Sequence, residues 1–135
     1  MIIETRDWRR FVSECHPDDL DTLHPDWRAF DWDAMLALPG WHMITDGQGS
    51  WCVLEPVNGS PHHFEGHLII AANMRGKAGL SVAQTMLDWM TDNLPIATLY
   101  ACAGSKKVAL FLRWLGFDYL DGHTHFLKWS PEPTP

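Results

Sequence analysis

The segment from His62 to Leu80 constrains the fold of this chain more than any other part of its sequence. It begins with the longest strand-like run, His62–Ala71, which passes into a short turn that carries Arg75 and Lys77 among its glycines. Apolar residues at helical spacing follow at once and predict a helix over about Ser81–Asn93. A buried strand joined directly to a helix favours a sheet whose faces are covered by helices.

Turn residues and hydrophobic periodicity divide the rest of the chain into further strands and helices. Other strands are predicted at Met1–Arg6, Trp41–Thr45, Trp51–Val57, Ile96–Ala103, Phe117–Leu120 and His125–Trp129. The second and third of these should form an antiparallel meander with His62–Ala71, and the last two should form a hairpin.

Three more helices are expected. One follows the cap Asp7 and ends where His16-Pro17-Asp18-Asp19 breaks it. Another opens at His24-Pro25 and runs to Leu38, and a third follows the cap Ser105. This last helix should face the core with Val108, Phe111, Leu112 and Leu115, and should end at Gly116.

This order of elements predicts an α/β (α+β) fold in a single domain. We expect residues 1–129 to form a mixed β-sheet of six to seven strands flanked by about four helices. Residues 130–135, Ser-Pro-Glu-Pro-Thr-Pro, should form an extended, Pro-rich C-terminal tail.

Composition excludes several classes of protein. The 135 residues are 46% hydrophobic and 20% charged, as in one globular domain, and no apolar run is long enough to span a bilayer. A net charge of −7 argues against a nucleic-acid binder. Three cysteines without a CxxC pair suggest a reducing, cytoplasmic setting.

Eight tryptophans are unusual for a chain of this length. Most should lie in the core, because an indole ring buries a large apolar area. The remainder could form an aromatic, Trp-rich surface for protein partners.

The turn after the long strand has the composition of an anion site. Backbone N–H groups at a helix N-terminus point toward one spot, and the helix dipole favours negative charge there. Arg75 and Lys77 would add positive charge. A phosphate or pyrophosphate suits such a turn, although an ordinary strand–turn–helix connection would have the same pattern.

Together with the element order and the segment Ser105–Phe117, this turn resembles the GNAT family of acyl-CoA-dependent N-acetyltransferases. The resemblance covers nearly the whole chain by element order, and two motifs by sequence. It implies that the strand before the turn splays from the next strand, that the pantetheine lies in the gap, and that the turn amides hold the pyrophosphate. It therefore implies acetyl-CoA as cofactor and an amine as acceptor, with no metal.

The residues that the resemblance assigns to acetyl-CoA are Ile70, Arg75, Gly76, Lys77, Ala78, Gly79 and Ser105. The match to the family motifs is incomplete. Ala78 stands where the family has its first required glycine, and Leu112 stands where a tyrosine often serves as general acid. Because leucine has no proton to give, the leaving thiolate would need water or another residue.

Within the family, the chain is most similar to the small GNAT-like internal virion proteins of short-tailed phages. They share the Gly-Lys-Ala turn and a leucine in the tyrosine slot. This similarity implies a phage-encoded protein in the host cytoplasm or packaged in a virion. Two hypotheses therefore stay open: an acyl-CoA N-acyltransferase, or a non-catalytic virion component that acts through protein contacts.

A second constellation lies within the long strand. His63, Glu65 and His67 occupy alternate positions and should project from one face. They could ligate zinc, with His123 and His125 as further candidates, but a polar, exposed strand face is the simpler reading. In active GNAT members a glutamate on this strand deprotonates the acceptor ammonium, which implies Glu65 as the first candidate base and His67 as the second.

Overall fold

The computed structural model describes residues 1–129, so the predicted tail over residues 130–135 lies outside the described part. Seven strands form one sheet in the order β1-β2-β3-β4-β5-β7-β6. The strands are β1 Ile3–Glu4, β2 His42–Thr45, β3 Trp51–Pro56, β4 His63–Ile69, β5 Thr98–Cys102, β6 Asp118–Asp121 and β7 Thr124–Lys128. All neighbouring strands are antiparallel except β4 and β5, which are parallel.

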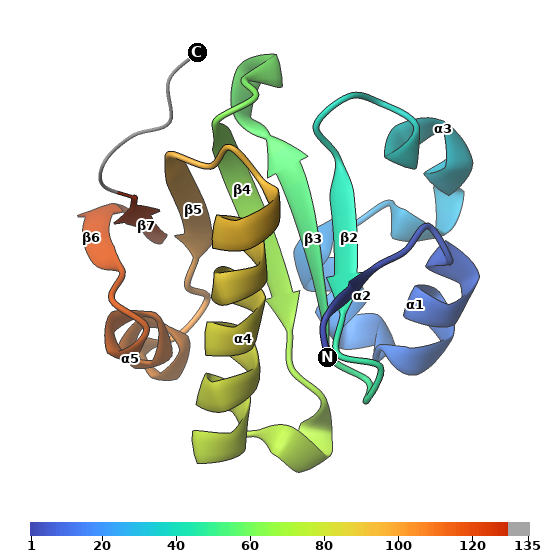
Figure 1. Cartoon of the computed structure of the whole chain (residues 1–135). Coiled ribbons are helices and arrows are strands. Elements are labelled where there is room, and N and C mark those ends of the chain that lie inside the picture. Colours follow the sequence, from blue (N-terminus) through green and yellow to red (C-terminus); the bar gives the residue numbers. More distant parts are fainter. Residues whose placement is uncertain (130–135) are drawn as a thin grey trace.

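Five α-helices and three short 3₁₀ turns accompany the sheet. The helices are α1 Trp8–Glu14, α2 Pro17–Leu23, α3 Trp32–Leu36, α4 Lys77–Asn93 and α5 Lys106–Trp114, and the 3₁₀ turns are η1 Trp27–Ala29, η2 Val57–Gly59 and η3 Ala72–Met74 (Figure 1). The predicted α/β fold with a mixed sheet is therefore confirmed.

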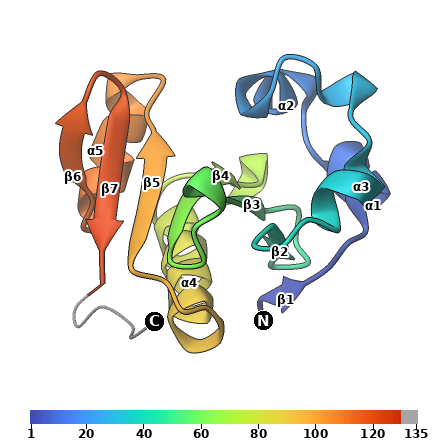
Figure 2. The ribbon, with the colours of Figure 1, turned by 90° about the horizontal axis from the view of Figure 1, so that it is seen from above.

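Two separate cores hold the layers together, one on each face of the sheet. Phe11, Leu20 and Trp32 from the N-terminal helices pack on Trp51 and Ile69 of the sheet. On the opposite face, α4 and α5 cover strands β2 to β5 with apolar side chains that include Val82, Met86, Leu87, Met90 and Leu112. Figure 2 shows α2 and α4 on opposite sides of the strands.

The sheet is splayed between its two parallel strands, as the resemblance implied. Pairing of β4 with β5 covers three rungs and ends at Glu65 and Tyr100. On its other side β4 stays paired with β3 as far as Ile69. The residues Gly66–Ile69 therefore lie along β3 while β5 diverges from them. Gly66 stands at the point of parting, where an added Cβ would lie 3.0 Å from the Leu99 side chain.

The predictions for the N-terminal helices are correct in part. Asp7 caps α1 by accepting a hydrogen bond from the Arg10 N–H, as expected. The segment expected only to break that helix instead begins α2, because Pro17 occupies its first position, where no N–H is needed. The helix predicted from His24-Pro25 to Leu38 is wrong: η1 and α3 replace it, since Asp31 starts a new helix with its own side-chain cap.

Helix α4 begins at Lys77, four residues before the predicted start at Ser81. Ala78 and Gly79, expected in the turn, therefore belong to its first turn. Helix α5 has the predicted Ser105 cap, and Gly116 follows it with a φ of 98°. Val108 is exposed, so its assignment to the core was wrong; the buried side of this short helix is carried by Leu112.

The tryptophans are mostly buried or half-buried, as predicted. Trp51, Trp32 and Trp27 are buried, and Trp114 is the exposed exception among the residues described. The predicted Trp-rich contact surface therefore reduces to one indole on α5. No helix in the described part of the chain combines the length and apolar character needed to cross a membrane.

Candidate functional site

The carboxyl ends of β4 and β5 bring two helix N-termini to the same edge of the sheet. Because these strands are parallel, the turns that follow them lie side by side. In Figure 1 both strands run toward the bottom of the molecule, where α4 begins and α5 lies. The structure thus places Ile70, the segment Arg75–Gly79 and Ser105 at one edge, although they are separated in sequence.

The N-terminus of α4 presents backbone donors without a side-chain cap. Gly76 is the capping residue, and its φ of 86° and ψ of −138° belong to a region that glycine alone adopts readily. The first turn of a helix has no intrahelical partner for its N–H groups, so those of Lys77, Ala78 and Gly79 are available to an acceptor. A 17-residue helix adds a positive dipole end at this spot.

Arg75 is exposed beside this turn but already has an anionic neighbour. Its Nη2 lies 3.7 Å from Oδ2 of Asp19 at α2, and both side chains are partly open to solvent. An exposed pair of this kind contributes only about 0–1 kcal/mol, so a phosphate could replace Asp19. Lys77 is exposed at the first position of α4.

Gly79 is required by close packing of the turn onto α4. A Cβ at this position would lie 2.7 Å from the carbonyl oxygen of Met74 and 3.2 Å from Cγ2 of Ile70. Gly79 therefore lets the 3₁₀ turn η3 lie directly against the first turn of α4. Ile70, just beyond β4, is half-buried here.

Ser105 has a structural role at the start of α5. Its side chain accepts a hydrogen bond from the Val108 N–H at 3.2 Å and caps the helix. The predicted cap is confirmed, and its position beside the end of β5 places it at the edge where the α4 turn lies.

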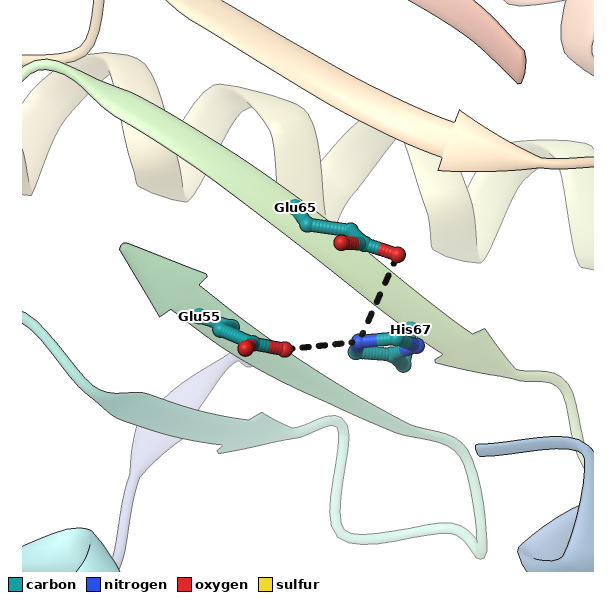
Figure 3. A group of neighbouring side chains, drawn as sticks. All are labelled: Glu55, Glu65 and His67. Atoms are coloured by element: carbon teal, nitrogen blue, oxygen red, sulfur yellow. Dashed lines mark hydrogen bonds and ion pairs between the residues drawn. The ribbon is translucent and has the colours of Figure 1, made fainter. Parts of the chain in front are cut away.

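Three polar side chains meet on the face of the sheet opposite α4. His67 Nε2 lies 3.4 Å from Oε2 of Glu55 and 3.9 Å from Oε1 of Glu65. Figure 3 shows the imidazole held between the two carboxylates, with Glu55 on β3 and the other two on β4. All three are half-buried, which leaves them open to a ligand. We call Glu55, Glu65 and His67 the carboxylate–imidazole group.

The carboxylate–imidazole group brings together three side chains of the types that serve as general bases. The ligand atoms lie within 4.8 Å of one another, a spacing that is also compatible with a metal ion. The predicted trio is corrected in one respect: His63 is not part of this group, and its Nδ1 is buried without a hydrogen-bond partner. Nor do His123 and His125 join it.

A cavity of about 550 Å³ lies between the N-terminal helices and the end of β4. Its walls include the acidic residues Glu14, Asp18 and Asp19, together with Ile69 and Arg75. Ile69 follows His67 on the same face of β4, because side chains two positions apart in a strand point the same way. The cavity and the carboxylate–imidazole group therefore share one face of the sheet.

The three cysteines differ in their burial. Burial raises the pKa of the Cys52 thiol from 9.0 to about 12. Burial and the charges of Asp19 and Glu14 raise the pKa of Cys15 to about 12 as well. Cys102 is free and exposed.

At about pH 8 we expect iodoacetamide to modify one thiol of the native protein and all three after denaturation, because the thiolate is the reactive form. Mass spectrometry counts the modified thiols.

The raised pKa values also predict a loss of stability in alkali. A thiol whose pKa is higher in the folded state stabilises the fold fully at a pH below its pKa in the unfolded chain. This contribution to the free energy of unfolding is lost as the pH rises toward about 12. The urea midpoint should therefore fall between about pH 8 and pH 11, and fall less in Cys52→Ala. Equal falls in the two proteins would contradict the assignment.

Comparison with known proteins agrees with this architecture. No family model matches the sequence, and no curated protein is similar to it. Among solved structures, the chain is similar to the N-acetyltransferase PseH of Campylobacter jejuni, with a TM-score of 0.64 and 14% identity over 96% of this chain and 98% of that one. PseH has also been solved in complex with acetyl coenzyme A.

Two further structures show the same likeness. The ribosomal-protein-alanine N-acetyltransferase of Brucella melitensis has a TM-score of 0.63 and 15% identity over 93% of this chain and 96% of that one. Aminoglycoside 6′-acetyltransferase type Ii has a TM-score of 0.61 and 14% identity over 100% and 99%. The fold is therefore that of the GNAT acetyltransferases, as the sequence motifs predicted. The similarity to phage virion proteins stays a prediction.

Proposed function

We propose that this protein is an acyl-CoA-dependent N-acyltransferase. The observation that carries the proposal is the parting of β4 from β5 after Glu65, together with an uncapped helix N-terminus that follows the end of β4. A parted pair of strands offers unpaired backbone groups to an extended ligand, and the helix end offers N–H donors to its phosphates. A pantetheine chain with a diphosphate at one end has both features.

The residues at the helix end fit the diphosphate. Arg75 and Lys77 supply positive charge, Gly76 supplies the backbone geometry that exposes the amides, and Gly79 keeps the turn against the helix. Ala78 is exposed, so its methyl group narrows the approach without filling it. Ile70 and Ser105 would flank the pantetheine at the ends of the two strands.

The carboxylate–imidazole group would activate the acceptor. An amine reaches the protein as an ammonium ion, which must lose a proton before its nitrogen can attack a thioester. Glu65 is the first candidate for that proton and His67 the second, with Glu55 beside the imidazole. The carbon–nitrogen bond then forms, the carbon–sulfur bond breaks, and the thiolate leaves.

No acidic side chain stands where the family often has its tyrosine general acid to protonate the leaving thiolate. Leu112 is buried and apolar, so the proton would come from water or from another residue. Loss of a positioned general acid costs about 10²–10⁴ in rate, which predicts a slow enzyme.

Arg75→Glu tests the cofactor site. We expect the wild-type protein to bind acetyl-CoA with a micromolar Kd in calorimetry. The variant should bind at least about tenfold more weakly, because a charge-assisted hydrogen bond to a phosphate contributes about 1.5–3 kcal/mol. Arg113→Glu makes the same charge change in the last turn of α5 and should leave the Kd unchanged. Wild-type protein that gives no heat at millimolar acetyl-CoA would contradict the proposal.

A second candidate is a non-catalytic GNAT-fold protein that works through protein contacts, in a phage virion or free in the host cytoplasm. It is favoured by Leu112 in the tyrosine position and by exposed apolar side chains on α5 and β6, among them Leu110, Trp114, Tyr119 and Leu120. Absence of acetyl-CoA binding, together with recovery of the protein from purified virions, would favour this candidate over the enzyme.

A further inference from the structure

An apolar cavity of about 40 Å³ lies inside the molecule at the point where β4 and β5 part. It opens between Gly66 and Leu68 of β4 and Leu99 and Ala101 of β5, and its floor is formed by α4 and α5. Gly66 and Ala101 are the first residues beyond the last paired rung, Glu65–Tyr100. The cavity thus opens at the gap between β4 and β5 that the proposed function gives to the pantetheine chain.

The size and lining of this cavity specify the chemistry of an occupant. Protein interiors are normally close-packed, and an unfilled space in a core lowers stability. Apolar cavities stay dry because water finds no hydrogen-bond partners in them. A volume of about 40 Å³ has room for about three water-sized groups. Such a space suits a short hydrocarbon chain.

We propose that this cavity receives the acyl chain of the thioester and makes the protein select short acyl groups longer than acetyl, with butyryl the best fit. This inference rests on the proposed acyl-CoA site. It also accounts for Leu112, which lines the cavity, because an apolar side chain there replaces a hydroxyl that would have to be buried without a partner.

The wall opposite Leu112 depends on Gly66. A Cβ at this position would lie 3.0 Å from Cδ1 of Leu99 and 3.6 Å from Cδ2 of Leu54. Any larger residue would push the Leu99 side chain, which itself lines the cavity. The glycine at the point of parting therefore keeps space open between the two strands.

The test measures binding, so that it does not depend on turnover. Calorimetry would compare CoA, acetyl-CoA, propionyl-CoA, butyryl-CoA and octanoyl-CoA on the full chain without an acceptor. Each methylene that the cavity buries should tighten binding about fourfold. We expect the affinity to rise from acetyl to butyryl and to fall for octanoyl, which is longer than the cavity.

Ala101→Val fills the cavity from β5 with a residue that favours strands. It should bind butyryl-CoA no more tightly than acetyl-CoA, whereas the wild type should prefer butyryl-CoA. Ala83→Val repeats the test from α4, so that a folding defect in one variant leaves the other to decide. Ala109→Val is the matched control, since Ala109 packs near this core without lining the cavity.

Each outcome separates the two proposals. Equal affinity for acetyl-CoA and butyryl-CoA in the wild type would overturn the acyl pocket and leave the cofactor site standing. A butyryl preference that survives in both folded filling variants would place the chain elsewhere and overturn the assignment. Absence of binding by CoA and by every thioester would overturn the proposed function and this inference with it.

Discussion

Replacement of Glu65 by glutamine should lower kcat for acyl transfer by about 10²–10⁴ while the Kd for acetyl-CoA stays unchanged. Glutamine keeps the shape of the side chain and cannot accept a proton from the acceptor ammonium. The Glu65 carboxylate lies on the half-buried face of β4, 3.9 Å from His67 Nε2, where its loss removes the first candidate base. Thiol release at saturating amine and acetyl-CoA measures the effect.

The sheet supplies a matched control for this substitution. Glu4 on β1 also pairs with a histidine, since its Oε2 lies 2.6 Å from Nδ1 of His42. Glu4→Gln therefore removes the charge from a similar pair at the β1 edge of the sheet and should leave turnover unchanged. Wild-type turnover in Glu65→Gln would exclude Glu65 as the base; His67→Gln would then test the second candidate.

Trp51→Ala should destabilise the fold by about 3–5 kcal/mol. Trp51 is fully buried on β3, its ring centroid lies 5.3 Å from that of Phe11, and its Nε1 donates to Glu14 Oε1 at 3.1 Å. Truncation removes the largest apolar surface between α1 and the sheet and leaves a cavity. Urea denaturation followed by circular dichroism gives the change in free energy of unfolding.

Trp114→Ala is the matched control, because it makes the same truncation of a tryptophan at an exposed position. The Trp114 side chain is 64% exposed, so its truncation should change the free energy of unfolding by no more than about 0.5 kcal/mol. A loss of several kcal/mol at Trp114, or a loss below about 1 kcal/mol at Trp51, would contradict the division of the tryptophans between core and surface.

The differences between the predicted and observed helices have local physical causes. The sequence carries two signals around Pro17, since proline ends a preceding helix and also suits the first position of a new one. Our prediction included only the end of the first helix, whereas in the structure α1 ends before Pro17 and α2 begins at it. The early start of α4 has a similar origin. Gly76 begins the helix with a positive φ, which glycine can adopt easily but need not adopt, so the residue type alone did not reveal the start.

The candidate site was only partly visible in the sequence. Glu65 and His67 were found because alternate residues of a strand share a face. Glu55 was missed, because its place beside His67 depends on the register of β3 against β4, in which Glu55 pairs with Glu65. The alternation of residues in the strand after Trp51 predicts which face Glu55 shares with Trp51. It does not predict the register, that is, which residue of β4 pairs with Glu55.

The amino-acid sequence alone determined the order of the strands, the helices that follow β4 and β5, and the caps Asp7 and Ser105, because hydrophobic period and capping side chains act over a few residues. Tertiary structure decided where β4 leaves β5, which carboxylates flank His67, and that an apolar space remains beside Gly66 and Ala101. Those features arise from strand register and from the packing of distant side chains, which no short stretch of sequence contains.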